Sequence, residues 1–207
     1  MKKSIIFDMD GTLWKASSAS AKGWNKALEA LGEEARVTAV DLESVAGKPY
    51  QECITSLLPN LSDKYPDLLE TFNFHETESV KQYGGDFYEG VLEGIKELSK
   101  DYSVFVVSNC QDWYLKLFLK FSKLENVLVD YDCHGMSQVP KSEMIQNMKK
   151  KYSLEDTVYV GDTVWDEQAA DLSNTKFIHV SYGFGKPEKD CISFANFSDL
   201  VNFFKNN

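Results

Sequence analysis

Two aspartates near the start of the chain, Asp8 and Asp10, are the residues with the clearest capacity for chemistry. They follow the apolar run Ile5-Ile6-Phe7, which has the length and composition of a buried strand. Alternate side chains of an extended segment point to the same side, so both carboxylates face one way. Burying two carboxylates is costly unless a cation compensates them, and oxygen ligands suit magnesium. The pair therefore predicts a Mg²⁺ site.

Two alternative interpretations of this motif are an EF-hand calcium loop and a solvated turn. The EF-hand register fails, because Gly11 stands where a further ligand is needed and Ala19 stands at the twelfth position instead of a glutamate. The solvated turn stays open for this motif taken alone.

Three further polar residues stand at the ends of predicted strands or at the start of a predicted helix. Ser108 follows the apolar run 104–107, Asp162 follows 157–160, and Lys141 stands at the start of a predicted helix. In open α/β sheets, ligands bind outside the carboxyl ends of the strands. We therefore expect these side chains and the aspartate pair to meet at one edge of a sheet.

The elements that position these residues alternate between strands and amphipathic helices. This order predicts an α/β fold with a doubly wound, parallel sheet. The expected strands cover residues 5–7, 104–107, 126–129, 157–160 and 177–180, and the expected helices lie between them.

A helical segment separates the first two expected strands, and it is far longer than a simple crossover connection needs to be. We predict that residues 15–84 form a small helical cap domain, while residues 1–14 and 85–207 form the α/β core. Within the insertion, Gly32 is expected to end a helix and Pro49 to begin one. The insertion directly follows the aspartate pair, which is the place for a lid.

Taken in order, the motifs Asp8–Leu13 (DMDGTL), Ser108-Asn109, Lys141 and Gly161–Asp166 (GDTVWD) resemble those of the haloacid dehalogenase superfamily. The similarity covers essentially the whole chain, and the inserted segment resembles the helical cap of that superfamily. The nearest branch contains phosphoglycolate phosphatases and β-phosphoglucomutase-like enzymes. The resemblance implies a Rossmann-like core and a magnesium-dependent phosphatase that hydrolyses a small phosphate monoester through an aspartyl-phosphate.

The resemblance also implies a role for each matching residue. Asp8 would attack phosphorus, and Asp10 would protonate the leaving group and then activate water. Asp8, Asp162 and the backbone carbonyl of Asp10 would hold the metal, and Asp166 would position a water molecule of the metal. The residues expected to bind the phosphoryl group are Thr12, Ser108, Asn109 and Lys141.

Each of these motifs has an ordinary structural explanation when taken alone. Ser108-Asn109 is compatible with a simple turn at a strand end, and Lys141 with a solvated lysine at a helix start. Asp162 and Asp166 are compatible with a helix cap and a solvated acid. The order of the motifs along the chain favours the site.

Within the cap, Gly47-Lys48-Pro49 resembles the substrate-specificity loop of related enzymes. Lys48 would there contact an anionic leaving group. A solvent-facing lysine beside a turn is the alternative, because charged side chains are mostly exposed.

Composition limits the partners of the protein. The net charge of −10 and the absence of a basic stripe argue against a nucleic-acid partner. No apolar run approaches the ~20 residues of a membrane span, and Lys2 and Lys3 are not followed by a signal-peptide segment, so we expect a cytoplasmic location and no membrane partner. The four dispersed cysteines are expected to be reduced. The sequence leaves the oligomeric state open and is compatible with a monomer.

Three functions are therefore considered. The first is a phosphatase that acts on a small phosphorylated metabolite with Mg²⁺. A sugar phosphomutase shares the aspartyl-phosphate step, and a non-catalytic binding or regulatory module could use the same fold. The complete set of acids argues against the non-catalytic module.

Overall fold

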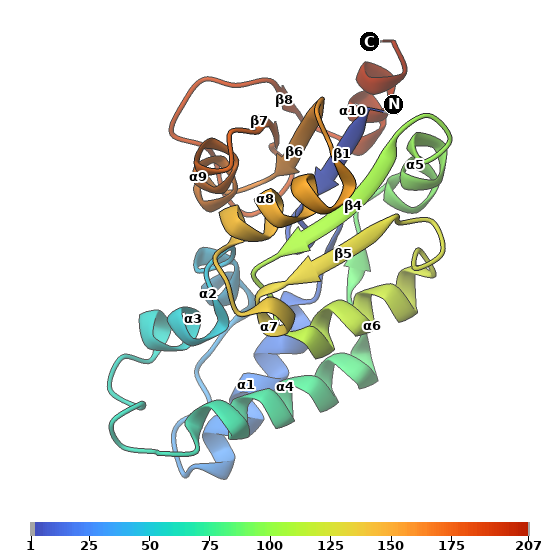
Figure 1. Cartoon of the computed structure of the whole chain (residues 1–207). Coiled ribbons are helices and arrows are strands. Elements are labelled where there is room, and N and C mark those ends of the chain that lie inside the picture. Colours follow the sequence, from blue (N-terminus) through green and yellow to red (C-terminus); the bar gives the residue numbers. More distant parts are fainter. Residues whose placement is uncertain (1–2, 207) are drawn as a thin grey trace.

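The computed structural model describes residues 3–206. Residues 1, 2 and 207, which the sequence analysis assigns to the core domain, lie outside the described residues. The same holds for Lys2 as part of the argument for a cytoplasmic location. The main sheet has six parallel strands in the order β5-β4-β1-β6-β7-β8 (Figure 1). Its strands are β1 (Ser4–Phe7), β4 (Ser103–Ser108), β5 (Asp130–Cys133), β6 (Thr157–Gly161), β7 (Lys176–Val180) and β8 (Ser193–Phe194).

Strand β1 lies in the middle of the sheet, and all four of its residues are buried. It pairs with β4 on one side and with β6 on the other. Ile5 and Phe7 pack on one face, and Ile6 packs on the opposite face. A short apolar strand that is covered on both faces is typical of a parallel sheet.

Helices cover both faces of the sheet. The face with Ile5 and Phe7 is covered by α5 (Val91–Leu98), α6 (Asp112–Ser122) and α10 (Phe197–Lys205). The face with Ile6 is covered by α8 (Lys141–Tyr152) and α9 (Val164–Leu172). This arrangement confirms the predicted doubly wound α/β core.

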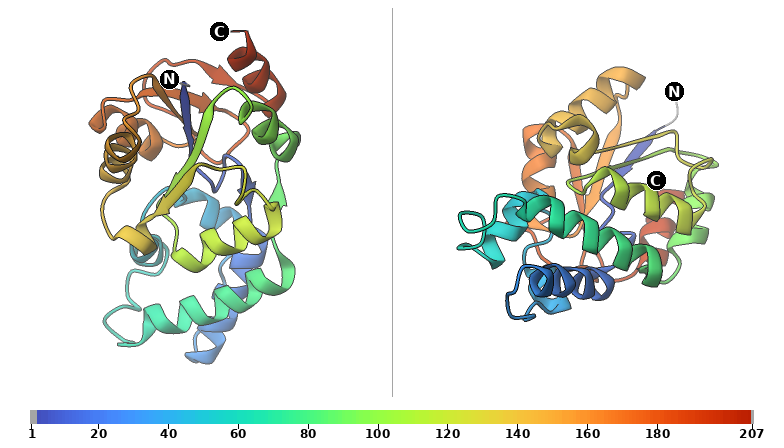
Figure 2. Two further views of the ribbon diagram at one scale, coloured as in Figure 1. Left: turned by 45° about the vertical axis from the view of Figure 1, so that its right-hand side comes forward. Right: turned by 90° about the horizontal axis from the view of Figure 1, so that it is seen from below.

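The inserted segment forms a separate helical layer below the carboxyl ends of the strands (Figures 1 and 2). Its helices are α1 (Ser17–Ala30), α2 (Ala39–Ser44), α3 (Tyr50–Leu57) and α4 (Leu68–Tyr83). Helices α1 and α4 pack side by side, and Trp24, Ile54 and Phe72 lie in a hydrophobic core of this layer. The short strands β2 (Trp14–Lys15) and β3 (Asp86–Phe87) pair where the chain enters and leaves it. The exact domain boundaries stay a prediction.

The prediction of a strand at residues 126–129 was wrong. The structure has a turn at 125–127 and a bend at 128–129, and β5 begins only at Asp130. This strand lies at the edge of the sheet, and most of its side chains are half-buried, so its sequence lacks the apolar run of a central strand. The sequence analysis also missed β2, β3, β8, α2, α10 and the short helix α7 (His134–Ser137).

Among residues 3–206, no helix is both long enough and apolar enough to cross a membrane.

Candidate active site

The register of the sheet brings three of the predicted site residues to one edge. Phe7 lies opposite Val106 of β4 and Val160 of β6. Asp8 comes one residue after Phe7, while Ser108 and Asp162 each come two residues after the paired valines. All three side chains are buried. The predicted meeting of these segments at the carboxyl edge is therefore observed.

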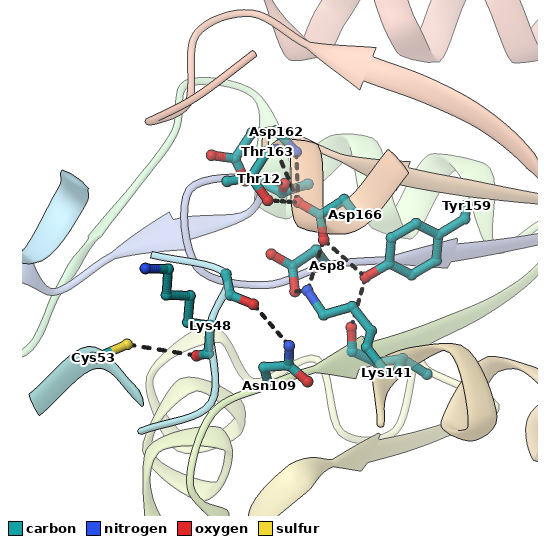
Figure 3. Close-up of polar contacts among 12 residues, drawn as sticks. Asp8, Thr12, Lys48, Cys53, Asn109, Lys141, Tyr159, Asp162, Thr163 and Asp166 are labelled. Atoms are coloured by element: carbon teal, nitrogen blue, oxygen red, sulfur yellow. Dashed lines mark hydrogen bonds and ion pairs between the residues drawn. The ribbon is translucent and has the colours of Figure 1, made fainter. Parts of the chain in front are cut away.

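Three buried carboxylates form a cluster at this edge. One oxygen each from Asp8, Asp162 and Asp166 lies within 4.8 Å of the other two. Their side chains converge from the end of β1, from the turn after β6 and from the first turn of α9 (Figure 3). Carboxylate oxygens at such a separation can ligate one cation, and oxygen ligands suit Mg²⁺.

Lys141 lies inside this cluster. Its ammonium nitrogen is 3.0 Å from Asp8 Oδ1 and 2.6 Å from Asp166 Oδ1, and its side chain is only 3% exposed. Pro140 fixes the start of α8, so Lys141 is the first residue of that helix. Burial lowers the pKa of Lys141, but Asp166 and Asp8 together raise it above its ordinary value. The lysine therefore stays protonated between the two carboxylates.

The cluster has more negative than positive charge. Burial, together with the charge of Asp166, raises the pKa of Asp8 from 3.8 to about 6 in spite of Lys141. Burial and the charges of Asp166 and Asp8 also raise the pKa of Asp162. Three carboxylates and one ammonium leave a formal excess of two negative charges, which matches a divalent cation. The residues present therefore fit Mg²⁺.

Asp166 has a second structural role at the start of α9. Its Oδ2 accepts hydrogen bonds from the backbone N–H of Thr163 at 2.9 Å and from the Thr163 hydroxyl at 2.7 Å. This capping box fixes the helix start, and Lys141 occupies the other carboxylate oxygen. Although burial raises the pKa of Asp166, these contacts bring it below the ordinary value.

Asp162 is held by neighbours from two other segments. Its Oδ1 accepts a hydrogen bond of 3.0 Å from the hydroxyl of Thr12, and its Oδ2 accepts one of 2.8 Å from the backbone N–H of Phe184. The segment at residues 182–185 thus helps to hold Asp162 in the site. The structure directs the Thr12 hydroxyl to Asp162, and phosphate binding by Thr12 stays a prediction.

Asp10 is separate from the three-carboxylate cluster. Its Oδ1 accepts a hydrogen bond of 2.9 Å from the hydroxyl of Tyr114 on α6. Burial raises the pKa of Asp10 from 3.8 to about 7, although the Tyr114 hydrogen bond opposes the shift. A carboxyl with such a pKa can give and take a proton near neutral pH.

A cavity of about 100 Å³ lies between the core and the cap helices. Asp8, Asp10, Ser108 and Asn109 lie on its core side, and Lys48 lies on its cap side. The size suits a small ligand. The cavity joins both predicted catalytic aspartates to the cap.

Asn109 connects the two sides of the cavity. Its amide nitrogen donates a hydrogen bond of 2.7 Å to the backbone carbonyl of Gly47 in the cap (Figure 3). Its amide oxygen is buried and has no hydrogen-bond partner among the described residues. Binding of phosphate by the Asn109 backbone stays a prediction.

Several residues that line the cavity were not singled out from the sequence. Tyr114 contacts Asp10, and Glu43 and Glu76 come from cap helices α2 and α4. A glutamate in an amphipathic helix usually faces water, so its presence in a helix does not by itself predict that it lines a cavity. The available signal for Glu76 was its helical spacing with buried Phe72 and Val80.

A family model described as haloacid dehalogenase-like hydrolase matches residues 5–180. Since this match covers most of the chain, the protein belongs to the haloacid dehalogenase-like hydrolase family. The resemblance predicted from the four motifs is confirmed.

Individual relatives agree with this assignment. A curated phosphoglycolate phosphatase from Aquifex aeolicus (strain VF5) is 27% identical over 212 residues, which cover 98% of this chain and 96% of that protein. A haloacid dehalogenase-like hydrolase structure from Streptococcus pneumoniae has a TM-score of 0.84 at 17% identity, with 98% of each chain covered. A hydrolase structure from Pseudomonas syringae has a TM-score of 0.78 at 18% identity, with 99% of each chain covered. At these identities the structural matches show a shared fold.

Proposed function

We propose that the protein is a magnesium-dependent phosphatase that hydrolyses a small phosphate monoester through a phosphorylated Asp8. The observation that carries this proposal is the position of Asp8, which lines the cavity and is paired with buried Lys141. The phosphoglycolate phosphatase among the relatives supports a phosphate ester as the substrate class.

The reaction begins with attack by Asp8. One carboxylate oxygen of Asp8 forms a bond to phosphorus, and the bond from phosphorus to the substrate oxygen breaks. Lys141 holds the Asp8 carboxylate in place by the contact of 3.0 Å and adds positive charge near the phosphoryl group. Asp10 lies in the same cavity and donates a proton to the departing oxygen.

Hydrolysis of the phosphorylated Asp8 uses the same residues, with Asp10 now acting as a base instead of an acid. Asp10, now ionised, accepts a proton from a water molecule as that water attacks phosphorus. The bond from phosphorus to the Asp8 oxygen breaks, which releases phosphate and restores the carboxylate. The Tyr114 hydroxyl keeps the Asp10 side chain oriented in both steps.

Asp8 and Asp162 would hold the Mg²⁺, together with the backbone carbonyl of Asp10. The ion supplies positive charge that offsets the repulsion between the Asp8 carboxylate and the anionic phosphoryl group. Asp166 acts by fixing Lys141 and the start of α9. Ser108 lies at the end of β4 on the cavity wall, and we expect its hydroxyl to bind a phosphoryl oxygen of the substrate.

The test measures release of phosphate from p-nitrophenyl phosphate with and without Mg²⁺. We expect D8N to abolish turnover and D10N to reduce it by about 10²-fold or more, the usual contribution of a general acid. D101N is the matched control, because Asp101 is exposed and lies outside the cavity lining. Full turnover by D8N would refute the proposal. Isomerisation of a hexose phosphate without release of phosphate would favour a phosphomutase instead.

The predictions of a cytoplasmic location, of no nucleic-acid partner and of a small phosphorylated metabolite as partner stay predictions.

A further inference from the structure

The end of the cavity formed by the cap has an unusual charge for an enzyme that handles anions. Four carboxylate side chains line the cavity, namely Asp8, Asp10, Glu43 and Glu76. Asp8 and Asp10 belong to the reaction centre. Glu43 and Glu76 come from the cap and have no role in the proposed reaction.

Glu76 is a buried carboxylate that accepts several hydrogen bonds. Its Oε2 accepts hydrogen bonds from the indole nitrogen of Trp24 and from the hydroxyl of Tyr50, both at 2.7 Å. An indole N–H can only donate, so this wall is built around an acceptor.

Glu43 is a second cap carboxylate that accepts a hydrogen bond, and it is half-buried. Its Oε1 accepts a hydrogen bond of 2.6 Å from the hydroxyl of Ser17. A carboxylate can accept about four hydrogen bonds, so acceptor capacity remains for a ligand. The buried amide oxygen of Asn109, which has no partner among the described residues, is another acceptor in the lining.

Four of the donors on this wall are already used. The side chains of Ser17, Trp24 and Tyr50 donate to the two cap glutamates, and Tyr114 donates to Asp10. A ligand group that lies beside these residues therefore meets mainly acceptors, and a group that donates hydrogen bonds fits this region best.

Lys48 offsets only part of the negative charge of the four carboxylates in the lining. It is the only lysine or arginine in the cavity lining among residues 3–206. Its ammonium nitrogen is 3.2 Å from Ser56 Oγ and 5.6 Å from the centroid of the Trp165 ring. Ser56 and Trp165 both lie outside the cavity lining. In the structure, the contacts of the Lys48 ammonium are therefore with groups outside the cavity.

Aromatic rings complete the lining. Trp24 and Tyr50 of the cap meet edge to face at 6.0 Å between centroids, and Trp113 and Tyr114 of α6 do so at 5.4 Å. Aromatic faces attract cations, and neighbouring rings at steep angles provide faces in more than one direction. Carboxylates combined with aromatic rings are a lining that suits a cationic nitrogen.

We propose that the leaving alcohol of the substrate carries a cationic nitrogen, as in a phosphorylated small amino alcohol, which the cap binds with Glu43, Glu76 and aromatic rings. This inference rests on the proposed phosphatase function. Esters whose alcohol carries a carboxylate are poor substrates, because two glutamates repel them. Phosphoglycolate, the substrate in the name of the Aquifex aeolicus relative, is such an ester.

The test compares three substrates of similar size that differ in the terminal group. These are 2-aminoethyl phosphate, 2-hydroxyethyl phosphate and phosphoglycolate, which end in an ammonium, a hydroxyl and a carboxylate. We expect kcat/KM to be highest for the ammonium and lowest for the carboxylate. Hydrolysis of p-nitrophenyl phosphate by the same preparation tests the proposed function separately.

Variants locate the origin of the preference. E43Q and E76Q should each lower the ratio of kcat/KM for the aminoethyl ester to that for the hydroxyethyl ester by about tenfold, the size of one charge-assisted hydrogen bond. E52Q is the matched control, because Glu52 is exposed on α3 and lies outside the lining. If E76Q fails to fold, E43Q carries the test, since Glu43 is only half-buried.

The outcomes separate the two proposals. Turnover of p-nitrophenyl phosphate with a preference for phosphoglycolate or the hydroxyethyl ester would overturn the amino-alcohol inference and leave the phosphatase intact. An ammonium preference that survives in both E43Q and E76Q would also overturn the inference. Absence of turnover on every ester would refute the phosphatase and the inference with it.

Discussion

Replacing Lys141 by methionine tests the electrostatics of the cluster. The substitution keeps a long, flexible side chain but removes the only ammonium that contacts Asp8 and Asp166 among the described residues. Both carboxylates stay buried, at 2% and 0% exposure of their side chains. Their charges then lack compensation, and breaking a buried pair in this way costs about 3–5 kcal/mol. K141M should therefore lose a large part of its free energy of unfolding at pH 8.

The loss should depend on pH in a defined direction. The pKa of Asp8 is raised to about 6 by burial and Asp166 even with Lys141 present, and removing the lysine raises it further. In the unfolded chain this pKa returns to its ordinary 3.8. The native variant therefore binds more protons than the unfolded chain between these values, and its stability falls as the pH rises. The deficit of K141M should be smaller at pH 5 than at pH 8.

Urea denaturation of wild type and K141M without added metal at both pH values measures this effect. K116M is the matched control, because Lys116 pairs with Asp112 on the exposed surface of α6 and its loss should leave the midpoint unchanged. K141M/D166N should recover part of the stability, because one uncompensated charge is removed with its partner. An equal deficit at pH 5 and pH 8, or a K116M deficit as large as that of K141M, would refute the reasoning.

Three other predictions follow from the same contacts. Addition of Mg²⁺ should raise the melting temperature of the wild type, and D162N should remove most of this shift, as measured by calorimetry at constant pH. G183A should lower activity by about tenfold or more, because the new methyl group would overlap the Asp162 side chain and disturb a residue of the reaction centre; steady-state kinetics measure this loss. N109A should raise KM more than it lowers kcat, because the hydrogen bond to Gly47 that connects core and cap is lost.

The core of the fold and the catalytic edge could be predicted because their signals are local. The strands β1, β4 and β6 are almost wholly apolar, and each is followed by a polar residue at the point where the strand ends. A parallel sheet then necessarily brings those ends to one side. Lys141 was predicted from the order of the motifs, and its burial between Asp8 and Asp166 follows from the packing of α8 beside α9.

The edge strand β5 and the cap side of the cavity could not be predicted from the sequence, for two different reasons. Strand β5 is half-exposed, so its sequence carries no apolar run. Glu76 is buried through contacts with Trp24 and Tyr50, which come from two other helices, and such long-range pairing leaves no local pattern. Specificity thus depends on tertiary contacts, whereas the reaction centre depends on strand ends.

The most direct test of the central claim is to find the phosphoryl group on the protein itself. Protein mixed with p-nitrophenyl phosphate and Mg²⁺ should be quenched in acid within the turnover time and analysed by peptide mass spectrometry. The account predicts one phosphoryl group on the peptide that contains Asp8, removable by hydroxylamine and absent from D8N. Phosphate release without any label on Asp8, or a label on another residue, would contradict it.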